Sequence, residues 1–329
     1  MCSAAPCRAV PATAVVSAAD PALRRSSVPR DTGHVTVDRV SIRPALVRAT
    51  RTLAEAGVDS PRTDAELLAA YVLGIPRGAL LLVDVFTAGQ LSVFDDLVAA
   101  RASRVPLQHL TGSVSFEGVD VAVGPGAFVP RPETELLVAW ALDRPLPSAP
   151  VAVDFCSGTG AIALAIAHAR PDARVFAVER DPAALEWLRR NATLRVGAGD
   201  RPIEVVAGDV TDPAVLGDLD GHVDLLLCNP PYVPDGTPVP AEVAEHDPTV
   251  AVFGGPDGLA VIRPVVSRAA SILRTDGWVG IEHDESQDRA VAALLAEAAA
   301  FAEISLHADL AGRPRFTTAR RVSAATGRR

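Results

Sequence analysis

The apolar run Val223–Cys228 and the tetrapeptide that follows it constrain the fold of this chain more than any other segment. The tetrapeptide is Asn229-Pro230-Pro231-Tyr232. An apolar run of this length that ends at a double proline is typical of a buried parallel strand. In open α/β sheets, ligands bind at the edge where such strands end. The segment therefore predicts a parallel α/β sheet with a site beside Asn229.

The chemistry of this tetrapeptide suits a planar –NH2 group. Asn229 offers a side-chain carbonyl oxygen, and Pro230 offers a backbone carbonyl oxygen without an N–H of its own. Two such acceptors bind both hydrogens of an amide or amine, while Tyr232 covers its face. We therefore predict that Asn229, Pro230 and Tyr232 are catalytic, and that Pro231 helps them to bind a weak nitrogen nucleophile.

A nucleotide-binding unit is expected upstream. Val151–Asp154 reads as a strand, Phe155–Gly160 as a glycine-rich loop and Ala161–Ala169 as a helix, and glycines let a ligand approach the backbone of such a loop. The predicted cofactor contacts in this unit are Asp154, Cys156, Ser157, Gly158, Thr159 and Gly160.

Two further strands are predicted to end in acids. Ala173–Val178 leads to Glu179, a position that usually binds ribose hydroxyls, and Ile203–Ala207 leads to Gly208 and Asp209, a candidate for an adenine amino group. The loop lacks the G-x-G-x-x-G spacing of NAD sites. The combination points to S-adenosylmethionine as cofactor, with Glu179, Asp209, Val210 and Asn229 completing the predicted contacts.

The chain resembles a known family, the release-factor glutamine N5-methyltransferases of the HemK/PrmC type. The resemblance spans residues 41 to 321. The matching segments are Phe128–Glu135 (F-x-x-R-x-x-T-E), Asp154–Gly160 (D-x-G-x-G-x-G), His246-Asp247-Pro248, Phe253–Leu259 and Asp309–Phe316.

This resemblance implies a seven-stranded, Rossmann-like methyltransferase domain preceded by a small helical domain that helps to hold a protein substrate. It implies methylation of the glutamine side chain in the Gly-Gly-Gln motif of peptide-chain release factors. Phe128, Arg131, Thr134 and Glu135 are then expected to bind that substrate together with the tetrapeptide.

Three alternatives remain open from the residues. The first is a glutamine methyltransferase that acts on a ribosomal protein. The second is an adenine or guanine N-methyltransferase, which would use Asn-Pro-Pro-Tyr equally well. The third is a non-enzymatic cofactor-binding or interaction protein, for which a damaged tetrapeptide or a damaged acid would be expected.

Two segments depart from the family pattern. Cys156 stands where the first loop glycine is usual, a substitution that costs little at negative φ and is damaging at positive φ. Ile281–Gln287 replaces a Glu-x-Gly segment, and we expect it to lie away from the transferred methyl group.

Composition limits the partners. The net charge of −9 argues against general nucleic-acid binding. No apolar stretch reaches the roughly 20 residues that a membrane helix needs. The histidines show no metal-binding spacing, so no metal is predicted, and His246 and His283 are expected at the surface. We expect a cytoplasmic monomer.

The expected domains follow from these patterns. They are a disordered extension (1–40), a helical domain (41–112), a linking hairpin (113–125), the methyltransferase domain (126–321) and a flexible tail (322–329). Ser60 and the pair Thr87 and Gln90 are predicted helix caps. Further predicted elements are helices at 258–273 and 287–300, a strand at 277–282 and a closing hairpin at 304–320.

Overall fold

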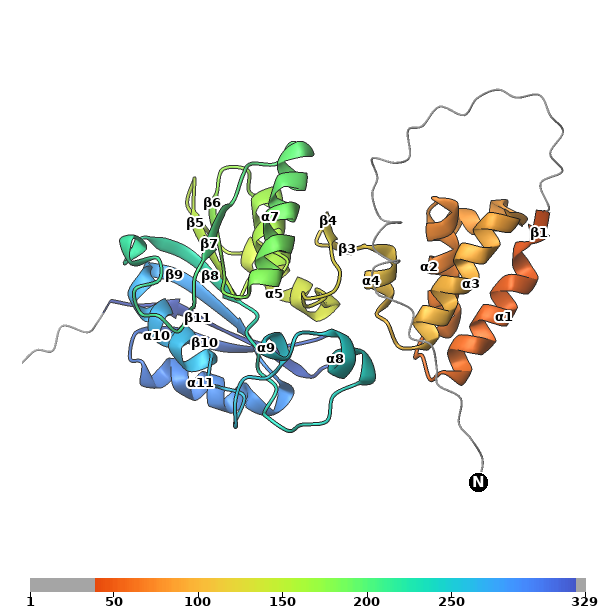
Figure 1. The fold of residues 1–329 in the computed structure, drawn as a ribbon. Coiled ribbons are helices and arrows are strands. Elements are labelled where there is room, and N and C mark those ends of the chain that lie inside the picture. Colours follow the sequence, from red (N-terminus) through yellow and green to blue (C-terminus); the bar gives the residue numbers. More distant parts are fainter. Residues whose placement is uncertain (1–38, 324–329) are drawn as a thin grey trace, which may run out of the picture. The chain divides into compact units, whose positions relative to one another are not determined.

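The computed structural model of the chain describes residues 39–323 (Figure 1). The predictions for residues 1–38 and 324–329 lie outside the described residues. Arg39 and Val40, which were expected to be disordered, belong to strand β1 (Arg39–Ser41). The chain divides between Gly112 and Ser113 into two compact units, and each is described by itself.

The first unit is mainly helical. Its buried core contains Leu53, Leu68, Phe86 and Phe94, and β1 pairs with β2 in a two-stranded antiparallel sheet. Its elements after β1 are α1 (Ile42–Glu55), α2 (Pro61–Leu73), the short 3-10 helix η4 (Arg77–Leu82), β2 (Val85–Thr87), α3 (Ala88–Ala102) and α4 (Leu107–Thr111).

The predicted capping box of α3 is confirmed, because the Thr87 side chain accepts from the Gln90 backbone and the Gln90 side chain accepts from the Thr87 backbone. The predicted cap at Ser60 is wrong, since its side chain makes no capping hydrogen bond. Proline at the first position of α2 removes one N–H donor from that helix end.

The second unit contains a seven-stranded sheet in the order β10-β11-β9-β8-β5-β6-β7. Strands β5 to β9 are parallel to their neighbours, while β11 and β10 close one edge in antiparallel fashion. The predicted seven-stranded α/β sheet is therefore confirmed. The strands are β5 (Val151–Phe155), β6 (Arg174–Glu179), β7 (Glu204–Ala207), β8 (Val223–Cys228), β9 (Leu273–Glu282), β10 (Phe301–Ala308) and β11 (Pro314–Arg321).

Helices cover both faces of this sheet (Figure 1). In β8, Leu225 and Leu227 join the core with α5 and α6, whereas Leu226 and Cys228 join the core with α10 and α11. This two-sided burial explains why β8 is apolar at nearly every position.

The remaining elements are the hairpin β3 (Ser113–Phe116) and β4 (Val119–Ala122), helices α5 (Pro132–Leu142), α6 (Ala161–Ala169), α7 (Pro182–Gly197), α8 (Ala241–His246), α9 (Thr249–Val252), α10 (Ile262–Ile272) and α11 (Asp288–Glu297), and the 3-10 turns η5 (Gly217–Leu219) and η6 (Glu285–Gln287).

The helix expected from Gly258 begins four residues later, at Ile262. Gly258 has φ +73°, and a Cβ there would lie 2.1 Å from the carbonyl oxygen of Tyr232. This close approach requires a glycine turn at the place where the sequence pattern predicts helix. The following strand starts at Leu273 rather than Gly277. Among residues 39–323, no helix has both the length and the apolarity needed to cross a membrane.

The two capping positions yield a matched stability test. Thr87→Ala should lower the free energy of unfolding by about 1 kcal/mol, because an N-terminal amide of α3 loses its acceptor. Ser60→Ala should change it by less than about 0.5 kcal/mol, as is usual for surface changes. Urea unfolding of both variants measures the difference, and equal losses would contradict the assignment of the caps.

Two loop glycines give a second matched pair. Both Gly158 (φ +54°) and Gly160 (φ +88°) adopt the left-handed conformation. Alanine costs about 1–2 kcal/mol in that conformation. At Gly160 the new Cβ would also lie 2.4 Å from Leu188 Cδ1, while at Gly158 it would meet nothing within 4 Å. Gly160→Ala should therefore destabilise the protein by a further ~1–3 kcal/mol relative to Gly158→Ala. Similar midpoints in thermal unfolding would refute this packing difference.

Candidate active site at the carboxyl ends of the parallel strands

The strand register brings the predicted site segments to one edge of the sheet. Cys228 of β8 pairs with Phe155 of β5 and with Ile281 of β9. Since parallel strands share one direction, the residues that follow them meet at a common edge. Across the sheet, these residues are Glu282, Asn229 and Cys156, followed by Glu179 at the end of β6.

A chain of hydrogen bonds orients Asn229. Its amide nitrogen Nδ2 donates to Thr134 Oγ1 at 3.1 Å, and this hydroxyl donates to Glu282 Oε2 at 2.7 Å. The hydroxyl of Tyr232 donates to the other carboxylate oxygen of Glu282 at 3.2 Å. Glu282, which the sequence did not identify as a site residue, therefore joins three predicted site residues: Thr134, Asn229 and Tyr232. Pro230 and Pro231 are buried beside them.

Ile281–Gln287 was expected to lie away from the transferred methyl group, but Glu282 of this segment is linked to Asn229 through Thr134. Glu282 ends β9 next to Asn229 and is 1% exposed. Burial raises the pKa of its carboxyl group to about 7. An acid that follows the apolar segment Trp278–Ile281 is the same signal that identified Glu179, so the edge rule applied to every parallel strand would have found it.

The signature Phe128–Glu135, which leads into the first turn of α5, makes several separate contacts. The guanidinium of Arg131 pairs with Asp247 at 2.6 Å and lies 4.8 Å from the ring centre of Phe128. This ion pair connects the signature to the segment that follows the tetrapeptide. Glu135 lies elsewhere: its charge raises the pKa of Glu117, after the larger effect of burial. No hydrogen bond within the described residues joins Glu135 to Asn229 or Thr134.

The surface prediction for His283 is also wrong. The side chain is fully buried, and its Nε2 shares a hydrogen bond of 2.7 Å with Thr317 Oγ1. Its backbone N–H donates to the carbonyl of Arg315 on β11, so the pairing of β9 with β11 continues to His283. His246 is half-buried at the end of α8.

The glycine-rich loop is held by an acid of the neighbouring strand. Glu179 Oε2 accepts from the backbone N–H of Gly158 at 2.8 Å, and Oε1 accepts from the N–H groups of Arg180 and Asp181. Cys156 has φ +58°, the unfavourable case named from the sequence. Glu179, which was predicted to bind ribose, therefore also shapes the loop around this strained residue.

The loop fits a cationic, nucleotide-like ligand. Asp154 Oδ1 is buried and has no hydrogen-bond partner among the described residues. Burial raises the pKa of this carboxyl group to about 8, so a nearby positive charge would favour its ionised form. Open space lies beside Gly158, where an added Cβ would meet nothing within 4 Å. S-adenosylmethionine, whose sulfonium is positively charged, suits this combination.

The remaining predicted cofactor residues belong to this loop or follow β7. Ser157 donates its backbone N–H to Val178, and the Thr159 carbonyl accepts from Asn191. Asp209 follows β7, where its carboxylate accepts from the Thr211 amide at 2.8 Å and pairs with Arg180 at 3.1 Å. Val210 is buried in the core next to it.

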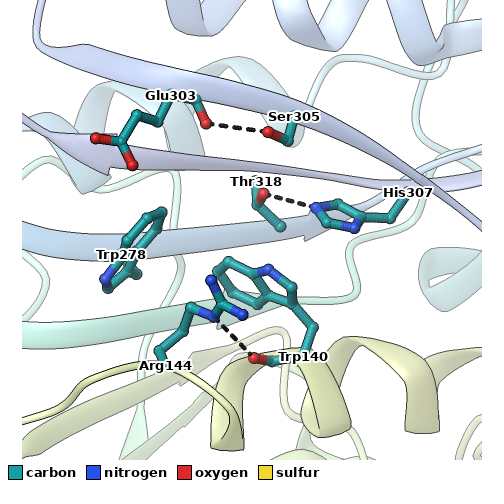
Figure 2. Close-up of a pocket in the computed structure, with 7 residues that line it drawn as sticks. All are labelled: Trp140, Arg144, Trp278, Glu303, Ser305, His307 and Thr318. Atoms are coloured by element: carbon teal, nitrogen blue, oxygen red, sulfur yellow. Dashed lines mark hydrogen bonds between the residues drawn. The ribbon is translucent and has the colours of Figure 1, made fainter.

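A separate pocket lies between α5 and the strands β9, β10 and β11 (Figure 2). Arg144 lies across it, with its guanidinium 5.2 Å from the ring centre of Trp140 and 5.7 Å from that of Trp278. None of the predicted site residues lines this pocket. The lining residues are Trp140, Arg144, Trp278, Glu303, Ser305, His307 and Thr318.

Two family models match the chain. Residues 44–112 match the PrmC N-terminal domain, and residues 132–245 match the methyltransferase small domain. The first match falls in the helical unit, and the second covers β5 to β8.

Curated relatives match over most of the chain. A release factor glutamine methyltransferase of Mycolicibacterium smegmatis is 52% identical over 86% of this chain and 98% of its own length. A protein of the same name from Mycobacterium tuberculosis is 47% identical over 86% of this chain and 92% of its own length. Another protein of this name, from Streptomyces coelicolor, is 45% identical over 84% of this chain and 96% of its own length. With this identity over nearly the full length of these relatives, the chain belongs to the release factor glutamine methyltransferase family.

Proposed function

We propose that this enzyme transfers a methyl group from S-adenosylmethionine to the side-chain amide nitrogen, N5, of the glutamine in the Gly-Gly-Gln motif of a peptide-chain release factor. The observation that carries the proposal is the orientation of Asn229. Its Nδ2 is engaged by Thr134, so its Oδ1 is left to accept a hydrogen from the target amide. Family membership supports the same substrate.

The proposed role of the protein is to orient a poor nucleophile. The lone pair of an amide nitrogen is delocalised into its carbonyl group. When Asn229 Oδ1 and the Pro230 carbonyl accept both N–H hydrogens, electron density returns to nitrogen and the lone pair points toward the methyl donor. Tyr232 covers the amide, and burial holds its pKa above the usual value, so it remains a neutral phenol. After the transfer, the methylated amide nitrogen carries a positive charge and loses one of its hydrogens to water as a proton.

The proposed cofactor site uses the loop after β5. S-adenosylmethionine supplies an electrophilic methyl group on a positively charged sulfur. Asp154 and the segment Cys156–Gly160 would hold it, with Glu179 at the ribose and Asp209 with Val210 near the adenine. The orphaned Asp154 oxygen and the space beside Gly158 support this assignment.

The substrate is proposed to be recognised as a folded protein. One glutamine side chain offers too little surface for selection, so binding energy from remote parts of the release factor must orient the reacting group. We assign that role to the helical unit (41–112) and to Phe128, Arg131, Thr134 and Glu135. The charge of −9 supports a protein rather than a nucleic-acid partner. We also propose that the enzyme acts as a monomer in the cytoplasm, where translation terminates.

The nucleophile-binding role of Asn229 has a direct kinetic test. Asn229→Ala should lower kcat by about 10²–10³-fold, the scale for losing one preorganised polar partner. The affinity for S-adenosylmethionine, measured by calorimetry on the same variant, should change much less. A variant that retains near-normal turnover would exclude this role.

The substrate class is tested with methyl-labelled cofactor and three acceptors in parallel. The intact release factor should be labelled much faster than a free Gly-Gly-Gln peptide, because the peptide lacks the remote contacts. Duplex DNA should not be labelled. Equal rates for peptide and protein would contradict recognition of the folded factor, and preferential labelling of DNA would overturn the proposed function.

A further inference from the structure

The side chain of an asparagine can present either its oxygen or its nitrogen to a ligand. Only the oxygen of Asn229 suits a target –NH2 group, because its nitrogen would place a donor against two donors. Rotation of the Asn229 amide by half a turn would therefore disable the proposed site. Something in the structure must hold one orientation against the other.

Thr134 can hold the Asn229 amide in one orientation only if its own hydroxyl hydrogen is already donated to another acceptor. A threonine hydroxyl carries one hydrogen and two acceptor lone pairs. With that hydrogen donated to Glu282 Oε2 at 2.7 Å, Oγ1 can only accept from Asn229. Asn229 then presents Nδ2 to Thr134, and the two atoms lie 3.1 Å apart. Without the carboxylate, the hydroxyl could donate to Asn229 instead, and the amide would be free to turn over.

The surroundings of Glu282 match this role. The side chain is fully buried, and its second oxygen accepts from the Tyr232 hydroxyl. The charged and titratable groups around it are Arg315 of β11, Glu133 of α5, Tyr232 after the end of β8 and Cys228 at that end. A fully buried carboxylate in this position donates no hydrogen bond when ionised, so it accepts from both hydroxyls at once.

We propose that Glu282 is a positioning residue that works through Thr134: it takes the single hydroxyl hydrogen of Thr134 and thereby fixes Asn229 with Oδ1 toward the glutamine amide. This inference rests on the proposed function for the identity of the target amide. The Asn229 orientation itself can be measured without any substrate.

The kinetic test compares four variants on the intact release factor. Thr134→Val and Glu282→Gln should lower kcat by about 10–100-fold, the range for groups that orient a contacting residue. Their Kd for S-adenosylmethionine should stay within about threefold, because the glycine loop is unchanged. Thr134→Ser keeps the hydroxyl and should retain most of kcat. Thr318→Val is the matched control, since this buried threonine bonds to His307 in the separate pocket.

The pH profile distinguishes positioning from packing. The raised pKa means that Glu282 is protonated below about 7 and charged above it. A protonated carboxyl has become a donor and no longer accepts from both hydroxyls, so kcat should fall as pH drops below about 7. This step should persist in Thr134→Ser and Thr318→Val and disappear in Glu282→Gln.

The second readout needs no activity. The Asn229 side-chain amide is followed by ¹⁵N–¹H spectroscopy with asparagine-selective labelling, and its signal is identified by its absence in Asn229→Ala. We expect a pH-dependent shift with a midpoint near 7 in the unmodified protein, lost in Glu282→Gln, and faster hydrogen exchange in Thr134→Val than in Thr134→Ser.

Three results would overturn the inference: kcat within twofold of the unmodified enzyme in both Thr134→Val and Glu282→Gln, equal losses in Thr134→Ser and Thr134→Val, or an Asn229 amide signal that is unaffected by these substitutions. If the unmodified protein does not methylate release factors, the proposed function fails, and the amide spectra still decide whether Glu282 sets the orientation of Asn229.

Discussion

The parallel pairing of β8 between β5 and β9 places every other part of the site. Because Cys228 is in register with Phe155 and with Ile281, the tetrapeptide, the glycine loop and Glu282 follow neighbouring strand ends. A slip of one residue would turn the alternate side chains of β8 to the opposite helical layer. The two apolar cores therefore stabilise both the sheet and the positions of the reacting groups.

Buried carboxylates arrange the other polar groups of this site. Glu179 accepts three backbone amides around the glycine loop, and Glu282 accepts two hydroxyls around Asn229. Burying a carboxylate is costly unless it is hydrogen-bonded. Both acids therefore lie where several donors converge, and each holds a segment that belongs to a different strand. This preorganisation suits a reaction whose main difficulty is the orientation of a weak nucleophile.

The closing strands have a functional as well as a structural part. β11 pairs with β9 and brings Arg315 next to Glu282 and Tyr232. His283, directly after Glu282, is fixed to Thr317 of β11. The antiparallel edge therefore contributes a positive charge beside Glu282 and Tyr232. Cys156 is a strained residue in this site, because it adopts φ +58° although it is not glycine. Glu179 and the strand ends confine the loop, and this confinement maintains the strained conformation.

Many elements of this structure could be predicted from the sequence alone, because the signals that predict them are local. An apolar run that ends at Asn229-Pro230 predicts a parallel strand and its edge, the loop after Asp154 predicts the turn, and Thr87 with Gln90 predicts a helix start. These features depend on backbone conformations and hydrogen bonds within a few residues.

Tertiary structure alone decided the contacts between distant segments. Thr134 and Glu282 are 148 residues apart, and Asn229 is 95 residues from Thr134. The sequence shows only that Glu282 ends an apolar strand and that Thr134 belongs to a signature. Their shared hydrogen bond and the burial of His283 follow from the register of β9 against β8 and from the packing of α5 in one of the two apolar cores.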